Sequence, residues 1–419
     1  MANDDLLANR FERKARLREV FKSTIELLNT NERLIRETET AKSDAIFYDE
    51  NARIDFDDER RETKISVTGE RTFEAARRLL SENSGKVAVL NFANSVTPGG
   101  GVLGGSGAQE ESLCRCSNLY PIIEQDRFYD SYYDKNRSEN DFRATDAVIY
   151  ARNVTVFKSD TDYPELLPED EWYKVDVITC AAPNLNYSGQ SLSFNQQTEI
   201  HRRRAEHILR SALANNARRI VLGAFGCGAF RNNPDSVIQG TKKALESIPN
   251  QFDEIVFAIY HQPYELKNYQ TFKRAFDGPS EVDYDLTRFV EAHNEHYEQA
   301  LSEIKAGRKE SHWMWYIFPQ LQGLGFSRMS YYYGISDIYE AKAYLNNKLL
   351  KDHLLEISNA LYKCDGEIID IMGNPDYMKL LSCMTLFKAA DPSIEIFQKI
   401  IDKFFLGQDD RKTLEMINL

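Results

Sequence analysis

Two adjacent carboxyl groups, Glu110 and Glu111, follow a glycine-rich segment and have the chemistry of an acid and a base. The segment reads Asn91-Phe-Ala-Asn-Ser-Val-Thr-Pro-Gly-Gly-Gly101, and seven residues separate it from Gln109. Six glycines free its backbone N–H groups to approach an anion closely: Gly99, Gly100, Gly101, Gly104, Gly105 and Gly107. A helix that starts near Ala108 would aim its positive end and both carboxylates at the same space. Taken alone, these residues also suit a flexible turn before a helix whose N-terminus favours glutamate.

A second glycine loop, Gly223-Ala-Phe-Gly-Cys-Gly-Ala-Phe-Arg-Asn-Asn-Pro234, has the composition of a diphosphate cradle. Gly226 and Gly228 leave the backbone open to phosphate oxygens, and Phe225 and Phe230 offer ring faces to a sugar or a base. Core packing explains either phenylalanine equally well. Two such loops in one domain are what a diphosphate-linked dinucleotide would require. A Walker-type phosphate loop is excluded, because its Gly-Lys-Ser/Thr is missing.

Each loop directly follows a predicted strand, at residues 87–91 and 219–222. Further strands are predicted at 175–180 and 254–261, and helices at 72–80, 196–216 and 234–247. Helices that alternate with strands indicate a largely parallel sheet covered on both faces, which is a three-layer α/β/α domain. Ligands of such sheets bind outside the carboxyl ends of the strands, where both loops lie. Leu17, Phe21, Ile25 and Leu28 predict an amphipathic helix that packs on this domain.

A change of composition divides the chain into two domains. The segment Asp277-Gly-Pro-Ser-Glu-Val-Asp283 is the predicted linker, because Gly278 and Pro279 break regular structure. Residues 1–278 then form the α/β domain. Residues 283–419 form a second, mostly α-helical domain with helices at 289–304, 338–345, 353–362 and 394–405. A length of 419 residues agrees with two cores.

The overall composition excludes several classes of protein. A formal net charge of -13 argues against a broad nucleic-acid-binding face, since phosphate contacts need clustered Lys and Arg. No apolar run is long enough for a signal sequence or a membrane span, so a cytoplasmic location without membrane attachment is expected. The six cysteines show no spacing typical of a zinc site or a disulfide framework. Neither a metal nor a cofactor is expected.

The run NFANSVTPGGG, with QEE seven residues later, resembles the signature of bacterial-type poly(ADP-ribose) glycohydrolases, which are macrodomain enzymes. GAFGCGAF is similar to their diphosphate loop, and DVITCAAPN at residues 176–184 is similar to their central strand. The resemblance covers about residues 10–278 and rests on three motifs in the expected order. It implies a macrodomain-like fold and the hydrolysis of ribose–ribose glycosidic bonds in poly(ADP-ribose), mainly from the chain end.

The resemblance also implies a role for each matching residue. Glu111 matches the catalytic glutamate, Glu110 and Asn94 match residues that hold the distal ribose, and Gly99, Gly100 and Gly101 lie along that ribose. Gln109 belongs to the same substrate-binding motif. The diphosphate cradle corresponds to Gly226, Cys227, Gly228 and Ala229, with Phe230 as an aromatic contact. Protonated Glu111 would donate to the leaving 2′-oxygen and its carboxylate would then activate water, while Glu110 would raise the proton affinity of Glu111 by like-charge repulsion.

Two other functions fit a macrodomain. It can be a reader module that only binds ADP-ribose marks, or a hydrolase of mono-ADP-ribose on protein or nucleic acid. The adjacent glutamates argue against a pure reader, since many reader modules lack an acid beside the distal ribose. The expected partners are therefore poly(ADP-ribose) or ADP-ribosylated macromolecules, with free ADP-ribose as the product.

The second domain resembles an uncharacterised helical bacterial family with the signature HWMWYIFPQ, residues 312–320. Lys309, His312, Trp313 and Arg328 could line a small site for an anionic or aromatic ligand. The favoured alternative is that Trp313 and Trp315 belong to the core and that His312 caps or hydrogen-bonds the backbone. In the first domain, His201-Arg-Arg-Arg204 is predicted to be a solvated helix face that could contact an anionic polymer.

Overall fold

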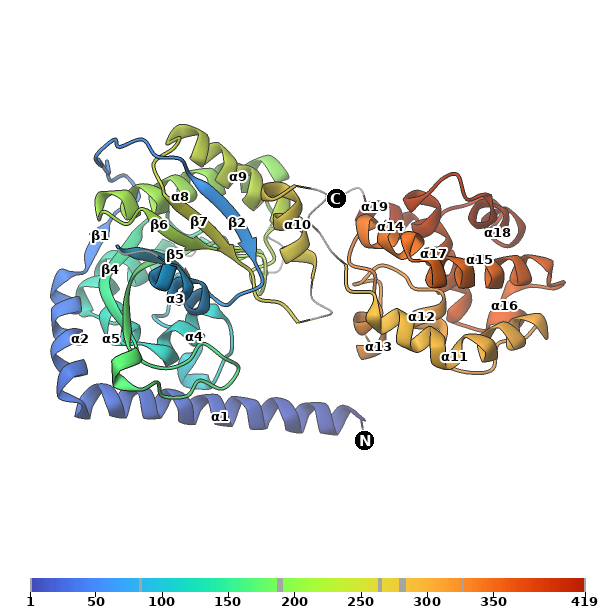
Figure 1. The fold of residues 1–419 in the computed structure, drawn as a ribbon, viewed down its shortest axis with the longest axis horizontal. Helices are drawn as coiled ribbons and strands as arrows, with labels where there is room; N and C mark the ends of the chain where they lie inside the picture. The colour runs from blue at the N-terminus through green and yellow to red at the C-terminus, as the bar shows by residue number, and fades with distance from the viewer. Residues whose placement is uncertain are drawn as a thin grey trace. The chain divides into compact units, whose positions relative to one another are not determined.

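The computed structural model shows two compact units in the chain. It describes residues 2–82, 85–139, 141–186, 191–262, 266–278, 284–325 and 327–417, with side chains from residue 11 onward. The first unit comprises residues 1–260 and 268–281, and the second comprises residues 261–267 and 282–419. Most of the predicted linker, residues 279–283, lies outside the described ranges. Figure 1 shows a sheet flanked by helices in the first unit and a group of helices in the second.

The described part of the first unit contains a seven-stranded mixed sheet with the strand order β1-β4-β5-β3-β6-β7-β2. The strands are β1 (Ile46–Tyr48), β2 (Lys64–Thr68), β3 (Val87–Ala93), β4 (Val148–Val156), β5 (Tyr173–Ala181), β6 (Arg219–Leu222) and β7 (Glu254–Ala258). Strands β5, β3, β6, β7 and β2 run parallel, whereas β4 is antiparallel to both β5 and β1. Because β3 and β6 are hydrogen-bonded neighbours, the glycine loops that follow them leave the same edge of the sheet.

The sequence predicted β3, β5, β6 and β7 and missed the other three strands. β1 and β2 are short and mostly half-buried, so they lack the continuous apolar run of a buried parallel strand. β4 contains a register shift between Ala151 and Val154, and Asn153 within it has a φ of 54°. A bulge of this kind moves the following side chains to the opposite face, which hides the strand period in the sequence.

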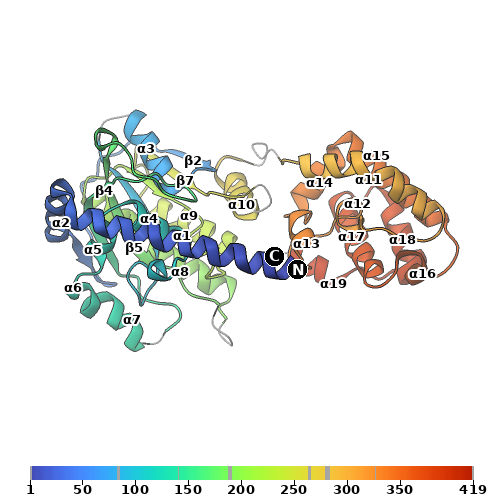
Figure 2. The ribbon, with the colours of Figure 1, turned by 90° about the horizontal axis from the view of Figure 1, so that it is seen from below.

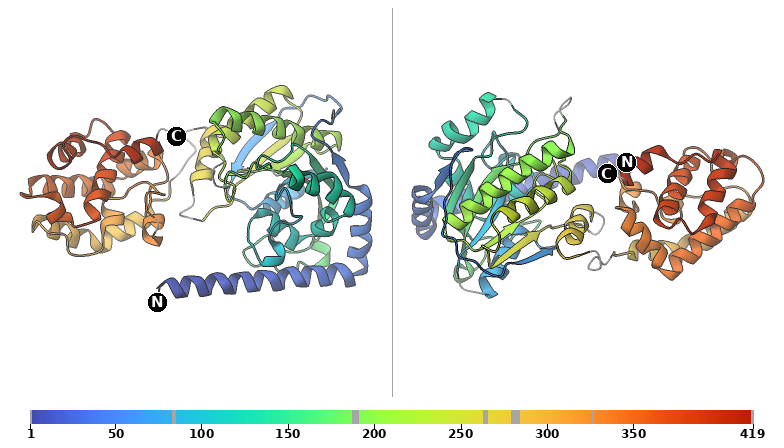
Figure 3. Two further views of the ribbon diagram at one scale, coloured as in Figure 1. Left: turned by 180° about the vertical axis from the view of Figure 1, so that it is seen from behind. Right: turned by 90° about the horizontal axis from the view of Figure 1, so that it is seen from above.

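Helices cover both faces of the sheet, as the two views of Figure 3 show. α3 (Thr72–Glu82), α4 (Gln109–Cys116) and α5 (Leu119–Ile123) pack on one face, and α8 (Phe194–Ala214), α9 (Pro234–Ser247) and α10 (Lys267–Phe276) pack on the other. Alternate side chains of β3 point to opposite faces of the sheet. Val87 and Val89 join the core beneath α3, α4 and α5, whereas Ala88 and Leu90 join the core beneath α8, α9 and α10. The predicted three-layer α/β/α fold is confirmed.

Helix α1 (Ala2–Thr30) is fastened to the layer that contains α4, and Figure 2 shows α1 running past α4. Of its predicted inner residues, Leu17, Phe21 and Leu28 are buried. Lys158 Nζ donates to Val20 O at 3.0 Å and to Thr24 Oγ1 at 2.8 Å, and Thr24 Oγ1 donates to Arg115 O at 2.6 Å. The remaining helical elements of this unit are α2 (Glu32–Asp44), η1 (Val102–Gly104), α6 (Asp126–Phe128), the π-helical turn η2 (Tyr129–Tyr133), α7 (Asp134–Glu139) and η3 (Glu169–Glu171).

The prediction of a solvated face at residues 201–204 is wrong for its first and last members. His201 and Arg204 are 2% and 1% exposed, because α8 turns them toward the carboxyl end of β5. Arg204 Nη1 donates to Ala181 O at 2.6 Å, and its Nε donates to Asp146 Oδ1 at 2.9 Å. Only Arg203 is an exposed residue here, so the segment is mainly a structural anchor.

The described residues of the second unit form helices joined by loops, with one isolated β-bridge between Leu321 and Ile335. Its helices are α11 (Thr287–Lys305), α12 (Met314–Ile317), α13 (Arg328–Tyr332), α14 (Ile338–Asn346), α15 (Lys348–Lys363), α16 (Ile368–Met372), α17 (Asp376–Ala390), α18 (Glu395–Phe405) and α19 (Arg411–Ile417). They enclose a hydrophobic core of their own. The sequence predicted α11, α14, α15 and α18. It missed α17, the central helix, because residues 382–387 are all buried and leave no polar face to set a helical period.

Among the described residues, no helix combines the length and the apolar character that crossing a membrane requires.

Candidate active site

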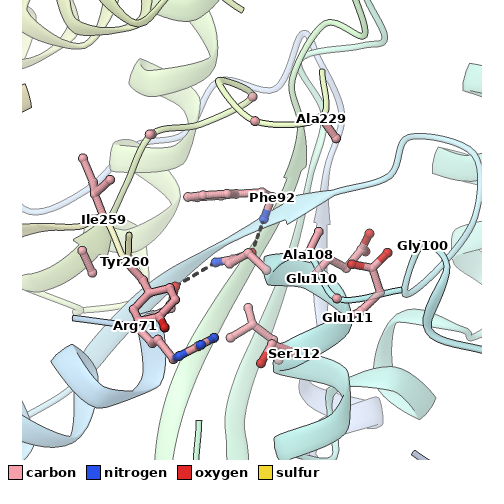
Figure 4. A pocket seen from close by; sticks show the side chains of 18 of the residues that line it. Arg71, Phe92, Gly100, Ala108, Glu110, Glu111, Ser112, Ala229, Ile259 and Tyr260 are labelled. Carbon is pink, nitrogen blue, oxygen red and sulfur yellow. Dashed lines mark hydrogen bonds between the residues drawn. The ribbon is translucent and has the colours of Figure 1, made fainter. Parts of the chain in front are cut away.

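A cavity of about 380 Å³ opens between the two glycine loops at the carboxyl ends of β3, β6 and β7. Figure 4 shows it lined by the first turn of α4 on one side and by Tyr260 and Ile259 on the other. Its lining includes most of the site residues expected from the sequence: Asn94, Gly100, Gln109, Glu110, Glu111, Gly226, Gly228, Ala229 and Phe230. The structure therefore brings residues that are up to 136 positions apart in the chain, Asn94 and Phe230, into one cavity.

Glu110 and Glu111 are both buried in the first turn of α4, but their carboxyl groups have different partners. Glu110 Oε2 accepts a hydrogen bond from the backbone N–H of Asn94 at 2.7 Å. Glu111 Oε1 accepts from the backbone N–H of Gly101 at 2.8 Å. Glu111 Oε2 is buried and has no hydrogen-bond partner in the structure. One carboxyl oxygen beside the cavity is thus left for a ligand to engage.

The environment of Glu110 favours its protonated form. Burial raises the pKa of Glu110 to about 8, and the charge of Glu111 adds to the rise while the N–H of Asn94 opposes it. Glu110 is 3% exposed, which agrees with burial as the main cause. The expected rise in the proton affinity of Glu111 caused by Glu110 stays a prediction.

Gln109 lines the cavity, and its amide is also hydrogen-bonded within the protein. Its Oε1 accepts from the N–H of Phe92 at 2.9 Å, and its Nε2 donates to Leu90 O at 2.7 Å and to Thr72 Oγ1 at 3.0 Å. Both ends of the amide are used by the protein. Gln109 thus ties the start of α4 to β3 and fixes the direction in which the two glutamates point.

Gly100 has no room for a side chain. It has a φ of 55°, and a Cβ atom placed on it would lie 2.7 Å from Glu111 Oε1 and 3.0 Å from Glu110 Oε2. The backbone therefore passes directly beside both carboxyl groups. Asn94 shapes the same loop, since its Oδ1 accepts from the N–H groups of Val96 at 2.9 Å and Thr97 at 3.0 Å.

The second loop is held from behind by Asn232, a residue that the sequence analysis did not single out. Asn232 Nδ2 donates to Pro183 O at 2.7 Å and to Gly226 O at 3.1 Å, and its Oδ1 lies 3.0 Å from Nε2 of His201. Burial lowers the pKa of His201 to about 4, so the neutral ring donates to Asn232. Gly228 faces open space, which exposes the backbone of the loop to a ligand.

The aromatic and sulfur side chains of this loop divide between core and cavity. Phe230 lines the cavity and also packs partly against the core, so its role as an aromatic contact of the ligand stays a prediction. Phe225 is 5% exposed and belongs to the core, which settles the alternative left open for it. The side chain of Cys227 packs partly against the same core, so this residue can offer a ligand only its backbone.

Three further residues line the cavity and were missed. Arg71 lies over the ring of Tyr260, with 3.7 Å between its Cζ and the ring centroid. Asp160 is buried and accepts from the N–H of Phe73 at 3.0 Å and from Ser112 Oγ at 2.9 Å, so it joins the starts of α3 and α4. Tyr260 lies just beyond Ile259 after the carboxyl end of β7, and that position was the available signal.

The second-domain candidate residues do not share one environment. Trp313 is 1% exposed and donates from Nε1 to Glu303 Oε2 at 2.8 Å, as the core alternative predicted. Lys309 Nζ lies 5.0 Å from the ring centroid of Trp313 and 2.7 Å from Asp376 Oδ2. His312 and Arg328 are exposed. A ligand site at these residues stays a prediction.

The sheet order, the two loops and the buried carboxyl pair define a macrodomain-like hydrolase. Residues 20–159 match the model of the microbial-type PARG catalytic domain, and residues 283–417 match that of a family described as a protein of unknown function (DUF1810). Poly(ADP-ribose) glycohydrolase from Thermomonospora curvata, bound to the inhibitor ADP-HPD, is 30% identical, with 62% of this chain and 99% of that chain covered and a TM-score of 0.54. The enzyme from Deinococcus radiodurans in complex with ADP-ribose is 32% identical, with 58% and 98% covered and a TM-score of 0.50. The chain belongs to the microbial-type poly(ADP-ribose) glycohydrolases.

A conserved hypothetical protein from Mycobacterium tuberculosis is 42% identical, with 32% of this chain and 97% of that chain covered and a TM-score of 0.32. No curated protein matches the chain.

Proposed function

We propose that the first unit hydrolyses ribose–ribose O-glycosidic bonds of poly(ADP-ribose) and releases ADP-ribose, with Glu111 as the acid and the base. The observation that carries this proposal is the unpartnered Oε2 of Glu111, which is buried beside the cavity while Oε1 is held by Gly101. A carboxyl oxygen in this state costs free energy unless a ligand engages it. The family membership indicates which ligand that is.

The proposed reaction uses one proton and returns it. Glu111 donates a proton to the leaving 2′-oxygen while the bond from that oxygen to the anomeric carbon of the distal ribose breaks. The Glu111 carboxylate then takes a proton from water, and the water oxygen bonds to the anomeric carbon. The products are ADP-ribose and a polymer shortened by one unit. The N–H of Gly101 stabilises the carboxylate that forms in the first step.

The rest of the cavity has the groups that a bound ADP-ribose needs. The open backbone at Gly228 and Ala229 suits the diphosphate, and Phe230 suits the ribose beside it. The stacked pair of Arg71 and Tyr260 at the opposite end offers a flat surface to adenine. A diphosphate held in this way would also stabilise positive charge at the anomeric carbon.

Defined substrates separate this function from its two rivals. The purified chain is incubated with poly(ADP-ribose), with mono-ADP-ribosylated protein and with mono-ADP-ribosylated nucleic acid, and the products are identified by mass. Release of ADP-ribose from the polymer is the expected result. Binding of ADP-ribose without any product would identify a reader module, and release from a mono-ADP-ribosylated substrate alone would identify a different hydrolase.

Activity is expected to survive exhaustive chelation, because the proposed chemistry needs only carboxyl and backbone groups. Among the described residues, no group of three His, Cys, Asp or Glu side chains is placed to hold a metal ion. The measurement is the initial rate of polymer hydrolysis before and after treatment with EDTA. A loss of activity that added Mg²⁺ restores would assign the chain a metal-dependent mechanism instead.

A chain that ends at residue 278 is expected to fold and to hydrolyse polymer at close to the native rate. The two units have separate hydrophobic cores, and all residues of the proposed site precede that point. Circular dichroism, thermal unfolding and polymer hydrolysis are compared for residues 1–278, residues 283–419 and the whole chain. If the first piece folds but becomes active only when the second is added, the second unit completes the active site and this prediction is wrong.

A further inference from the structure

Arg115 is a buried arginine in the helix that carries the two glutamates. It is 2% exposed and lies four residues after Glu111, which is about one helical turn. Its Nη1 donates to Ser106 O at 2.7 Å, and its Nε is buried without a hydrogen-bond partner. No carboxylate of the described residues lies within ion-pair distance of it. A guanidinium buried in this way is costly and needs a physical reason.

Ser106 links Arg115 to the loop that surrounds the carboxyl pair. The N–H of Ser106 donates to Gly101 O at 3.1 Å, and the N–H of Gly101 holds Glu111 Oε1. A Cβ atom on Gly101 would lie 2.4 Å from Ser106 Oγ, so the two residues are in close contact. A chain of hydrogen bonds therefore runs from the guanidinium through Ser106 and Gly101 to the carboxyl group of Glu111.

The charges around Arg115 come from two helices. Burial lowers its pKa, and Cys116, Glu111 and Cys114 on its own helix oppose that change, whereas Arg13 on α1 adds to it. Burial raises the pKa of both thiols well above the usual value, so Cys114 and Cys116 are neutral. Glu111 is thus the carboxyl group on which the charge of Arg115 acts. Residues four apart on a helix lie on the same side, which places the two side chains as neighbours.

We propose that Arg115 is a positioning residue with two roles. It holds the first glycine loop through Ser106, and it supplies the positive charge that stabilises Glu111 when Glu111 becomes a carboxylate. This inference rests on the proposed function and adds a residue to it. A charge fixed in a water-free site needs no reorganisation when the proton leaves Glu111. It also explains why an arginine is tolerated in a place where a leucine would pack at lower cost.

Two variants separate the charge from the hydrogen bond. Arg115→Gln keeps a donor for Ser106 O but removes the charge, and Arg115→Lys keeps the charge but loses the planar fork. For Arg115→Gln we expect kcat to fall by about tenfold to a hundredfold, with little change in KM. The alkaline limb of the kcat/KM profile should move upward by roughly one pH unit, because loss of a nearby cation raises the pKa of a carboxyl group. For Arg115→Lys the limb should stay at its native position.

A matched control comes from Arg219, another buried arginine of the same unit. Its guanidinium donates to the carbonyl groups of Leu79 and Gly85, at the opposite end of the sheet from the cavity. Arg219→Gln should lower the melting temperature without moving the alkaline limb. All variants are measured as the full chain, with ADP-ribose affinity as a check that the cavity is intact.

The inference is overturned if Arg115→Gln keeps the native alkaline limb and loses no more activity than Arg219→Gln. If Arg115→Gln does not fold, Arg115→Lys decides alone: a native limb supports the inference, and a shifted limb contradicts it. A native chain that releases nothing from polymer would refute the proposed function instead, so the two failures are distinguishable.

Discussion

Glu111→Gln is expected to lower kcat for polymer hydrolysis by about a thousandfold while ADP-ribose still binds. Glutamine has the same shape as glutamate and can still accept from the N–H of Gly101, but it cannot donate a proton to a leaving oxygen or accept one from water. The cavity should therefore keep its form and lose only its chemistry. Rates are measured on poly(ADP-ribose), and the affinity for ADP-ribose is measured by calorimetry.

Glu246→Gln is a suitable control, because it makes the same change of charge on the exposed side of α9. This control should retain the native rate. Hydrolysis at a normal rate by Glu111→Gln would show that another group is the acid. A loss of both rate and ADP-ribose affinity would mean that the variant is misfolded or that Glu111 mainly binds the ligand.

Gly100→Ala is expected to have the second-largest effect, a loss of about a hundredfold in kcat/KM. The new methyl group would lie 2.7 Å from Glu111 Oε1, at a φ of 55° that alanine adopts at a cost of about 1–2 kcal/mol. Either the loop or the glutamates must move, and both displacements change the direction in which Glu111 points. The crystal structure and the hydrolysis rate of the variant are the measurements.

Gly104→Ala provides the comparison within the same loop. A Cβ atom at Gly104 meets nothing within 4 Å, so this variant should fold and hydrolyse polymer as the native chain does. Equal activity of the two alanine variants would show that the close approach at Gly100 is irrelevant to the chemistry.

The sequence predicted most of the elements that build the site, because buried parallel strands and amphipathic helices leave clear patterns. β3 and β6 are mostly apolar and almost entirely buried, with a glycine-rich loop after each, and α9 has Asn233 as an N-cap before Pro234. β4 was missed because its bulge breaks the strand period, and α17 was missed because it has no polar face. Such elements are defined by tertiary packing rather than by local pattern.

The site residues likewise fall into those with a local sequence signature and those that depend on tertiary contacts. Glu110, Glu111 and the glycines carry signatures in type and spacing, and the structure places both glutamates at the cavity with Gly100, Gly226 and Gly228. Gln109 was assigned to substrate binding, although its amide is used by β3 and α3. Asn232 and Asp160 left no signal, since one acts through His201 on α8 and the other through the start of α3. A partner that is distant in sequence cannot be inferred from a single chain without its fold.

The contacts of helix α1 also bear on how the protein reaches its active state. Thr24 bonds to a residue 91 positions away, and Val20 to one 138 positions away. Bringing such distant segments together costs chain entropy before the contacts can offset it. Residues 20–24 of α1 precede both Arg115 and Lys158 in the chain, so on the ribosome these contacts can form only after both partners have been made. The docking of α1 beside α4 is therefore complete only after residue 158 has been made.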